Sequence, residues 1–323
     1  MKLVSYFDGQ REHLGVFIDD KIYNLHDCDP AIPDRMNELL WGGKALMEQA
    51  GNITARIQEG SIPAQPASAY RLLAPVPHPS SCRDGYAFRQ HVAAARRNRG
   101  LDMIPEYDHF PVFYFTNHQS IQGEGPIHCM PDHLDQLDFE LELAIVLNKK
   151  GRNIPASRAD AYIAGYMIMN DVSARGLQLE EMKLNLGPAK GKDFCTAIGP
   201  WLVTPDELAP YRIPARPGHS GARYALDMTC RVNGELVSKG SAADMDWTFA
   251  EILERCSYGV DLFPGDVIGS GTVGTGCFLE LNGTGRLHDP GYREQWLQPG
   301  DRVEMEITGL GCLTNTVVVS PES

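Results

Sequence analysis

Residues 138–147 read DFELELAIVL: acidic side chains stand at the first, third and fifth positions, and every other position is apolar. Because side chains of a β-strand point alternately to opposite faces, Asp138, Glu140 and Glu142 would share one face, about 6.5–7 Å apart. Carboxylates this close repel one another unless water screens them or a cation lies between them. Two interpretations follow, a solvated acidic face and a site for a hard cation such as Mg²⁺ or Ca²⁺.

Two further acidic residues could complete a cation site. Asp171 ends the apolar run GYMIMND, where a buried charge without a partner would be costly. Asp84, in CRDGYAFRQH, could belong to the same site or could cap the helix predicted after it. With Glu140 and Glu142, these two residues would supply four oxygen donors from three segments of the chain.

Short strands dominate the rest of the sequence. Helical patterns are confined to residues 34–58, 86–99 and 244–257, and no internal repeat is found. Strand runs with few long helices indicate a mixed, β-rich domain rather than a doubly wound sheet. The strand patterns are FPVFYFT (110–116), DFELELAIVL (138–147), AGYMIMND (164–171), YALDMTCRVN (224–233), DVIGSGTV (266–273), CFLELNGTG (277–285) and DRVEMEITGLG (301–311).

The start of the chain has a different character. Residues 2–25 read as short strands broken by turns, and residues 61–80 hold five prolines and are typical of a linker or an extended edge. We therefore predict an α+β, β-rich protein with a small N-terminal domain, residues 1–72, and a larger domain, residues 73–323.

Charge and composition exclude several classes of protein. The 323 residues carry 42 acidic and 29 basic side chains, a formal net charge of −13, which argues against a nucleic-acid-binding surface. No apolar run approaches the roughly 18 residues of a membrane-spanning helix. The eight cysteines lack CxxC spacing, which argues against a zinc ribbon. The N-terminus lacks the apolar core of a signal peptide, so we expect a cytoplasmic protein with reduced thiols.

Two residues are candidates for acid–base chemistry. His91 lies seven residues after Asp84, and on one helix the two would stand about two turns apart on the same side. Glu280, in GCFLELN, is either the outward residue of an alternating strand or a carboxylate that orients His91 and raises its basicity. For His91 the alternative is a surface or structural core histidine.

Two glycine-rich loops, residues 187–192 and 269–276, could carry a pocket. Lys192 could hold a substrate oxygen, or it could be a solvated loop lysine, and its surroundings do not have the P-loop spacing. A short basic cluster, Arg96, Arg97 and Arg99, is either a solvated helix end or a site for a substrate carboxylate.

Taken together, these motifs resemble the fumarylacetoacetate hydrolase family from about residue 75 to the C-terminus. The resemblance implies a mixed β-roll with a smaller N-terminal domain, and a homodimer. It places a divalent metal, Mg²⁺, Ca²⁺ or Mn²⁺, on Asp84, Glu140, Glu142 and Asp171. The motifs that carry it, in order, are Asp84-Gly85-Tyr86…Gln90-His91, Leu137–Glu142, Met169–Arg175, Gly191-Lys192, Gly271-Thr272 and Leu279-Glu280-Leu281.

The resemblance also implies roles for individual residues. His91 and Glu280 would activate water, and Lys192 and Gln178 would contact the polarised carbonyl or the leaving group. The positions that match substrate contacts are Tyr86, Tyr114 and Thr272.

Two departures from the family lie where the far end of a substrate would sit. A substrate-binding arginine of the family falls on Gly100, for which Arg99 or Arg97 could substitute, and a family tyrosine falls near Met182 or Lys183. These departures do not touch the residues expected to cleave the bond. They argue against fumarylacetoacetate itself as the substrate.

From the residues and the resemblance, we expect a metal-dependent hydrolase that cleaves a carbon–carbon bond in a small anionic 1,3-diketone or acylpyruvate. A decarboxylase, hydratase or isomerase on the same scaffold is the first alternative. A metal- or ligand-binding protein without catalysis is the second alternative.

Overall fold

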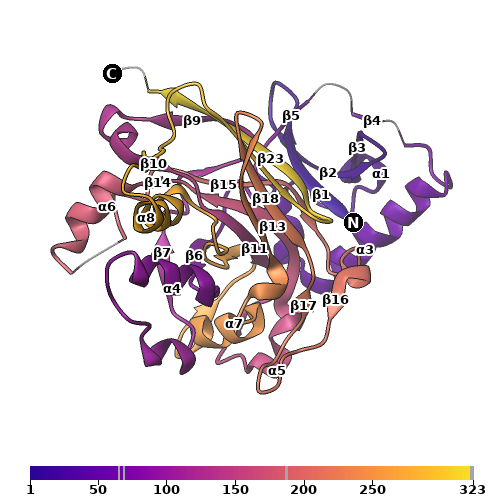
Figure 1. The fold of residues 1–323 in the computed structure, drawn as a ribbon. Helices are drawn as coiled ribbons and strands as arrows, with labels where there is room; N and C mark the ends of the chain where they lie inside the picture. Colours follow the sequence, from indigo (N-terminus) through magenta and orange to yellow (C-terminus); the bar gives the residue numbers. More distant parts are fainter. Residues whose placement is uncertain (65, 68–69, 186–187, 321–323) are drawn as a thin grey trace.

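The computed structural model describes residues 1–64, 66–67, 70–185 and 188–320 (Figure 1). A twelve-stranded mixed sheet crosses the molecule, and it runs from the N-terminal strands to the strands that carry the acidic motifs. Its main path is β4 (Pro66–Ala67), β3 (Lys21–Asn24), β2 (Glu12–Ile18), β1 (Lys2–Phe7), β15 (Thr196–Val203), β13 (Ile163–Asp171), β11 (Leu141–Leu147), β21 (Asp266–Gly269), β6 (Ser81–Gly85) and β7 (Phe113–Thr116), with β5 (Arg71–Leu72) on β1 and β8 (Ile121–Gln122) on β15.

A second, five-stranded sheet packs against the first. The main core fills the space between them, where Leu143 of β11 and Ile168 of β13 join Met305 of the second sheet. The other face of β11 is also covered, because Ala144 and Val146 belong to a second core with N-terminal residues. Burial on both faces explains why LAIVL is continuously apolar. The second sheet has the order β19 (Glu235–Ser241), β18 (Asp227–Val232), β22 (Arg302–Ile307), β23 (Gly311–Val319) and β9 (Gly125–Cys129).

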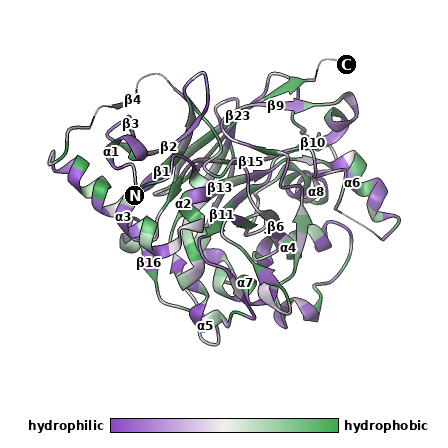
Figure 2. Ribbon diagram, turned by 180° about the vertical axis from the view of Figure 1, so that it is seen from behind, coloured by the Kyte–Doolittle hydropathy of each residue, from purple (hydrophilic) through white to green (hydrophobic). Residues whose placement is uncertain are grey.

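Helices cover the edges and ends of these sheets. Met47, Ala50 and Ile53 line the buried side of α3, and Figure 2 shows hydrophilic and hydrophobic residues alternating along it. At the opposite end of the molecule, α4, α6 and α8 gather beside the strands that carry the acidic motifs (Figure 1). The α-helices are α1 (Leu25–Cys28), α2 (Met36–Trp41), α3 (Gly43–Gln58), α4 (Arg89–Arg97), α5 (Ala156–Ala159), α6 (Arg175–Met182), α7 (Phe249–Ser257) and α8 (Phe278–His288).

Several short elements complete the fold. The 3-10 helices are Pro105–Asp108, Pro131–Gln136, Asp160–Tyr162, Ala209–Tyr211 and Ala242–Asp244. The two-stranded ladders are β10 (Leu137–Asp138) with β14 (Ser173–Ala174), β12 (Gly151–Arg152) with β20 (Asp261–Leu262), and β16 (Arg212–Ile213) with β17 (Arg223–Tyr224).

The fold is α+β and strand-rich, as the sequence predicts. Strands from residues 1–72 extend the large sheet, because β1 pairs antiparallel with β15 through Lys2↔Val203 and Leu3↔Leu202. In the described part of the chain, no helix combines the length and apolarity needed to cross a membrane.

Two local predictions are wrong. Residues 278–285, predicted as strand, lie in helix α8, whose first amides donate to Asp138 and whose Glu280 amide donates to the sulfur of Cys277. Asp84 is not on one helix with His91 and is no helix cap, because it lies on β6, and Phe88 is the N-cap of α4.

Candidate active site

Four carboxylates from adjacent segments converge at one end of the large sheet. Each of Asp84, Glu140, Glu142 and Asp171 offers an oxygen, and these oxygens all lie within 4.8 Å of one another. They meet because β13, β11, β21 and β6 are consecutive neighbours in the sheet. The four residues, here called the carboxylate cage, are at most 5% exposed.

Asp138 does not join the cage, although strict alternation predicts it on the same face. The backbone leaves strand geometry at Phe139 and Glu140, between β10 and β11. The carboxylate of Asp138 instead pairs with Arg175, with Oδ2 2.9 Å from Nε.

The charges of the cage are only partly balanced by protein groups. Lys192 Nζ donates to Glu140 (2.8 Å), Asp171 (2.6 Å) and the Ser173 hydroxyl (2.8 Å). Arg175 Nη2 donates to the other oxygen of Glu140 at 2.6 Å. Two cationic side chains, one of them shared with Asp138, therefore face four carboxylates.

This imbalance shifts the pKa values of the cage. Burial, reinforced by the nearby Asp171 charge, raises the pKa of Asp84 to about 7. Burial and the neighbouring Asp84 raise the pKa of Glu142 well above its usual value. Burial alone would raise the pKa of Glu140, but Lys192 and Arg175 lower it. Glu140, which both cations contact, therefore ionises readily, whereas burial raises the pKa of Asp171 even though the contact with Lys192 lowers it.

The donor set fits a divalent cation. Among the described residues, Asp171 Oδ1 is buried and has no hydrogen-bond partner. Asp84 and Glu142 share one donor, the amide of Gly271, at 3.0 and 3.1 Å. Clustered carboxylate oxygens with spare acceptor capacity are what hard cations such as Mg²⁺ and Ca²⁺ bind, so the cage is a possible divalent metal site.

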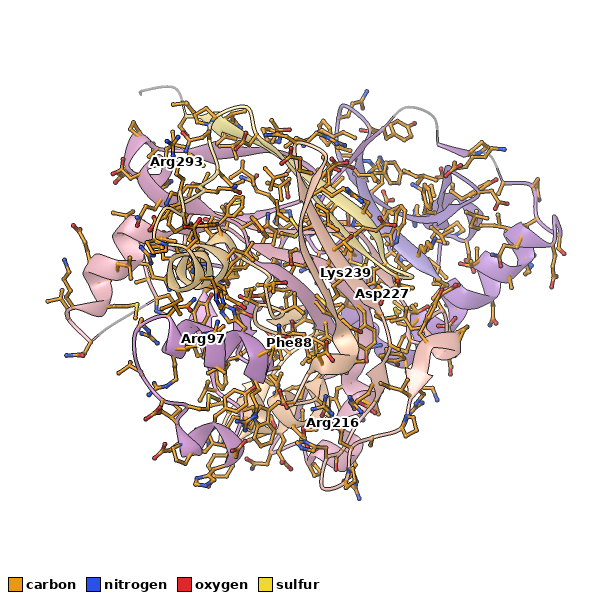
Figure 3. All side chains as sticks on the ribbon, viewed as in Figure 1. Phe88, Arg97, Arg216, Asp227, Lys239 and Arg293 are labelled. Atoms are coloured by element: carbon orange, nitrogen blue, oxygen red, sulfur yellow. The ribbon has the colours of Figure 1, made fainter. Side chains whose placement is uncertain are left out.

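His91 and Glu280 form a hydrogen-bonded pair between helices α4 and α8. His91 Nδ1 lies 2.6 Å from Glu280 Oε2, and the Thr275 amide donates to Oε1 of the same carboxylate at 3.0 Å. The two helices are joined further by Arg97, labelled in Figure 3, which donates to Thr284 at 3.0 Å. With Nδ1 engaged by Glu280, Nε2 is the ring nitrogen available for proton transfer.

The pair and two members of the cage, Asp84 and Glu140, line one cavity of about 460 Å³. Its wall includes Pro188 and Lys192 of one predicted loop and Gly271 and Thr272 of the other; Gly187 lies outside the described residues. Glu142 and Asp171 are not in the cavity wall. The remaining site residues predicted from the sequence line it: Asp84, Tyr86, His91, Arg99, Tyr114, Glu140, Gln178, Lys192, Thr272 and Glu280.

Comparison with known proteins settles the family. The family model described as fumarylacetoacetate (FAA) hydrolase C-terminal matches residues 81–318. The chain belongs to the fumarylacetoacetate hydrolase family. This confirms the resemblance found in the sequence motifs.

Relatives in this family carry out different reactions. The chain is 30% identical over 299 residues to the human mitochondrial oxaloacetate tautomerase FAHD2A, covering 92% of this chain and 84% of that protein. It is 30% identical over 323 residues to the oxaloacetate tautomerase YisK of Bacillus subtilis (strain 168), covering 95% and 96%. The crystallised fumarylacetoacetate hydrolase of Exiguobacterium antarcticum superposes with a TM-score of 0.72 at 27% identity, covering 99% of each chain.

Three predicted substrate-binding residues of this family member contact other site residues. The Tyr114 hydroxyl donates to Asp171, and the Thr272 hydroxyl lies 3.5 Å from Glu142. The ring of Tyr86 stands edge-on to that of His91, with centroids 5.8 Å apart. All three still line the cavity, so each can both support the site and meet a ligand.

Two charged cavity residues have no role in the sequence-based prediction. Arg175, 2% exposed, bridges Asp138 and Glu140 and donates to Gln178 at 2.9 Å. Its position four residues after Asp171, just beyond a run predicted to be buried, could have marked it as a candidate site residue. Arg286 lines the outer cavity from α8, and the incorrect strand prediction for this segment hid it.

Proposed function

We propose that this family member is a metal-dependent hydrolase that cleaves the carbon–carbon bond of an acylpyruvate or a related anionic 1,3-dicarbonyl. The observation that carries the proposal is the shared cavity, in which the His91–Glu280 pair stands beside the carboxylate cage. Decarboxylation needs no activated water, whereas hydrolysis does, and a carboxylate-oriented histidine is a common way to supply it.

In the proposed mechanism, Asp84, Glu140, Glu142 and Asp171 would hold Mg²⁺, Mn²⁺ or Ca²⁺. The cation would polarise the dicarbonyl and stabilise the negative charge of the departing enolate. His91 Nε2 removes a proton from water, which adds to the acyl carbonyl, and Glu280 stabilises the resulting imidazolium. When the bond breaks, the acyl group leaves as a carboxylic acid, and protonation of the enolate gives pyruvate.

Lys192 and Gln178 are proposed to stabilise the developing oxyanion. All three protons of the Lys192 ammonium have acceptors in the structure, namely Glu140, Asp171 and Ser173. Because all three protons are engaged, Lys192 would donate to a substrate oxygen only after Glu140 or Asp171 turns toward the cation. Gln178 accepts from Arg175 through Oε1, which leaves its amide protons for the cavity. A preorganised donor of this kind is worth about 3–4 kcal/mol in the transition state.

The outer end of the cavity is proposed to select the substrate. Arg99 and Arg286 line it together with the apolar side chains of Leu179 and Met182. A substrate with a second carboxylate and a short apolar segment would match these residues. In a chain of net charge −13, the local arginines and Lys192 would attract the anion. The active form is expected to be a homodimer.

Oxaloacetate tautomerisation is the second candidate function. The oxaloacetate tautomerases named above, which align with more than nine-tenths of this chain, favour it. The same cage would bind the 2-oxo acid, and His91 would remove a proton from carbon instead of from water. The two candidate functions use the same residues of the inner site. Only a comparison of substrates can therefore distinguish them.

A single comparison of substrates tests the proposal. The purified protein, with Mn²⁺ or after EDTA treatment, is assayed with acetylpyruvate and with the enol of oxaloacetate, following enol absorbance and pyruvate release. Hydrolysis predicts metal-dependent release of pyruvate and acetate from acetylpyruvate, with one ¹⁸O from labelled water in the acetate. Enol conversion of oxaloacetate without acetylpyruvate cleavage would select the tautomerase, and inertness toward both would contradict each candidate.

A further inference from the structure

One buried carboxylate outside the cage links the two halves of the site. Asp138 is fully buried and accepts four hydrogen bonds. Its Oδ1 accepts from the amides of Phe139 (2.9 Å) and Phe278 (2.7 Å). Its Oδ2 accepts from the Leu279 amide (3.0 Å) and from Arg175 Nε (2.9 Å).

The contact with Arg175 leads to the metal ligands. The guanidinium of Arg175 presents its donors in a planar, rigid fork. While Nε binds Asp138, Nη2 donates to Glu140 at 2.6 Å and Nη1 to Gln178 at 2.9 Å. The orientation that Asp138 gives to Arg175 therefore sets where the Glu140 carboxylate stands in the cage.

The contacts with α8 lead to the catalytic base. Phe278 and Leu279 are the first two residues of α8, whose amides have no acceptor within the helix. A carboxylate at this position satisfies them and interacts favourably with the helix dipole. The next residue, Glu280, holds the His91 imidazole. Asp138 thus fixes the helix end from which the base is oriented.

We infer that Asp138 is a positioning residue that couples occupation of the cage to the geometry of the His91–Glu280 pair. The inference rests on the proposed function for its catalytic half. The chemical group that acts is the single carboxylate, because its two oxygens together accept from Arg175 and from the first two amides of α8. Another connection runs through the loop in which Gly271 contacts Glu142 and Thr275 contacts Glu280, so the coupling through Asp138 does not act alone.

The test is the substitution Asp138→Asn, which keeps the size of the side chain and removes its charge. Asparagine keeps one acceptor oxygen and places an NH2 donor where the other oxygen stood, so some of the four present donors lose their acceptor. The negative charge that holds the Arg175 guanidinium is lost in either orientation of the amide. We expect the affinity for Mn²⁺, measured calorimetrically, to fall about 10–100-fold, as is typical when a residue that supports a metal ligand is lost. With acetylpyruvate as substrate, kcat should fall by a larger factor than KM changes.

Asp266→Asn is the matched control. Asp266 is 2% exposed, accepts from Ser81 (2.7 Å) and Phe263 (2.9 Å), and has Arg83 at 3.6 Å, but it does not line the cavity. This variant should lose thermal stability while keeping its affinity for Mn²⁺. An equal loss of Mn²⁺ affinity in both variants would overturn the inference, because general destabilisation would then explain it.

A combination with Glu280→Gln separates the two halves of the coupling. If Asp138 acts on the base through α8, its effect on kcat should shrink once Glu280 has been replaced, while its effect on Mn²⁺ affinity stays. Unchanged Mn²⁺ affinity together with fully additive kcat effects would reduce Asp138 to a structural role and overturn the inference.

A measurement on the unmodified chain covers the case in which Asp138→Asn does not fold. Mn²⁺ should slow amide hydrogen exchange at residues 278–280 more than at residues 249–257 of α7. Equal exchange with and without Mn²⁺ at residues 278–280 would overturn the coupling. If the chain turns over no substrate but Mn²⁺ protects these amides, the proposed function fails and the coupling stands.

Discussion

Two clusters of charged side chains in the described part of the chain differ in their charge balance and in their burial. The carboxylate cage collects four acids around one lysine and a shared arginine. The N-terminal cluster, made of Asp8, Arg11, His13 and Asp34, sets an arginine and a histidine, which is a cation when protonated, against two carboxylates. His13 lies 2.9 Å from Asp8 through Nε2 and 2.9 Å from Asp34 through Nδ1, and Arg11 lies 3.3 Å from Asp34.

The pKa values of one aspartate from each cluster shift in opposite directions. Backbone amides of Arg11 and Gln10, with His13, lower the pKa of Asp8 to about 2. In the cage, burial and the neighbouring Asp171 raise the pKa of Asp84 to about 7. A cluster whose charges balance has a structural role, whereas a cluster with an excess of negative charge indicates a cation-binding site. The contrast predicts that changes in the cage alter chemistry and those in the N-terminal cluster alter stability.

The largest expected effect is on turnover. His91→Ala removes the proposed base, so turnover should fall by about 10²–10⁴-fold, the usual contribution of general base catalysis. Affinity for Mn²⁺ should be retained, because His91 is not a member of the cage. Steady-state assays and calorimetry of the same preparation check both, and an unchanged rate would remove His91 from the mechanism.

The sequence predicts the cage better than it predicts the base. Glu140 and Glu142 belong to an alternating stretch and Asp171 ends an apolar run, so local patterns single out all three as candidates. The helix of Glu280 could not be foreseen, because CFLEL alternates like a strand and Gly283 and Gly285 disfavour a helix. Its first amides bind Asp138, 140 residues away in the sequence, and no local pattern reports such a contact.

Arg175 and Asp138 escape prediction for the same reason. Their contacts join segments 35 and 37 residues apart, and a motif gives the residue types without the pairing. The N-terminal strands were recognisable by their turns, but their pairing with β15, about 200 residues later, became visible only in the structure.

Metal should stabilise the folded chain through the cage. A cation at 100 times its dissociation constant adds about 2.7 kcal/mol to the free energy of unfolding if it binds only the folded state. Denaturation with Mn²⁺ and with EDTA measures this difference. Glu142→Gln should reduce it strongly, whereas Asp34→Asn should leave it intact, and the reverse pattern would break the contrast between the clusters.

The smallest expected effect concerns His13 and pH. Burial opposes its charge, but Asp34 and Asp8 outweigh burial and raise the pKa of His13 above its ordinary value of 6.5. This contribution to stability is fully present below about pH 6.5 and is lost as the pH rises through the folded-state value. Within the cluster Arg11 contacts Asp34, and from outside it the Tyr6 and Asn24 side chains contact His13.

His13→Gln tests this assignment. The variant should lose about 1–3 kcal/mol of unfolding free energy near neutral pH, because two carboxylates lose their shared partner. Its stability should also decline less than that of the unmodified chain between pH 6 and pH 9, as measured by urea denaturation. A variant with the same pH dependence as the unmodified chain would show that His13 does not carry it.

Calorimetric titration of the metal-free chain with Mn²⁺ tests the central claim, that the unbalanced cage is a divalent cation site. The account predicts one ion bound per chain, a loss of affinity of at least about tenfold in Glu142→Gln, and unchanged affinity in Asp34→Asn. Absence of binding to the unmodified chain, or equal affinity in Glu142→Gln, would contradict it.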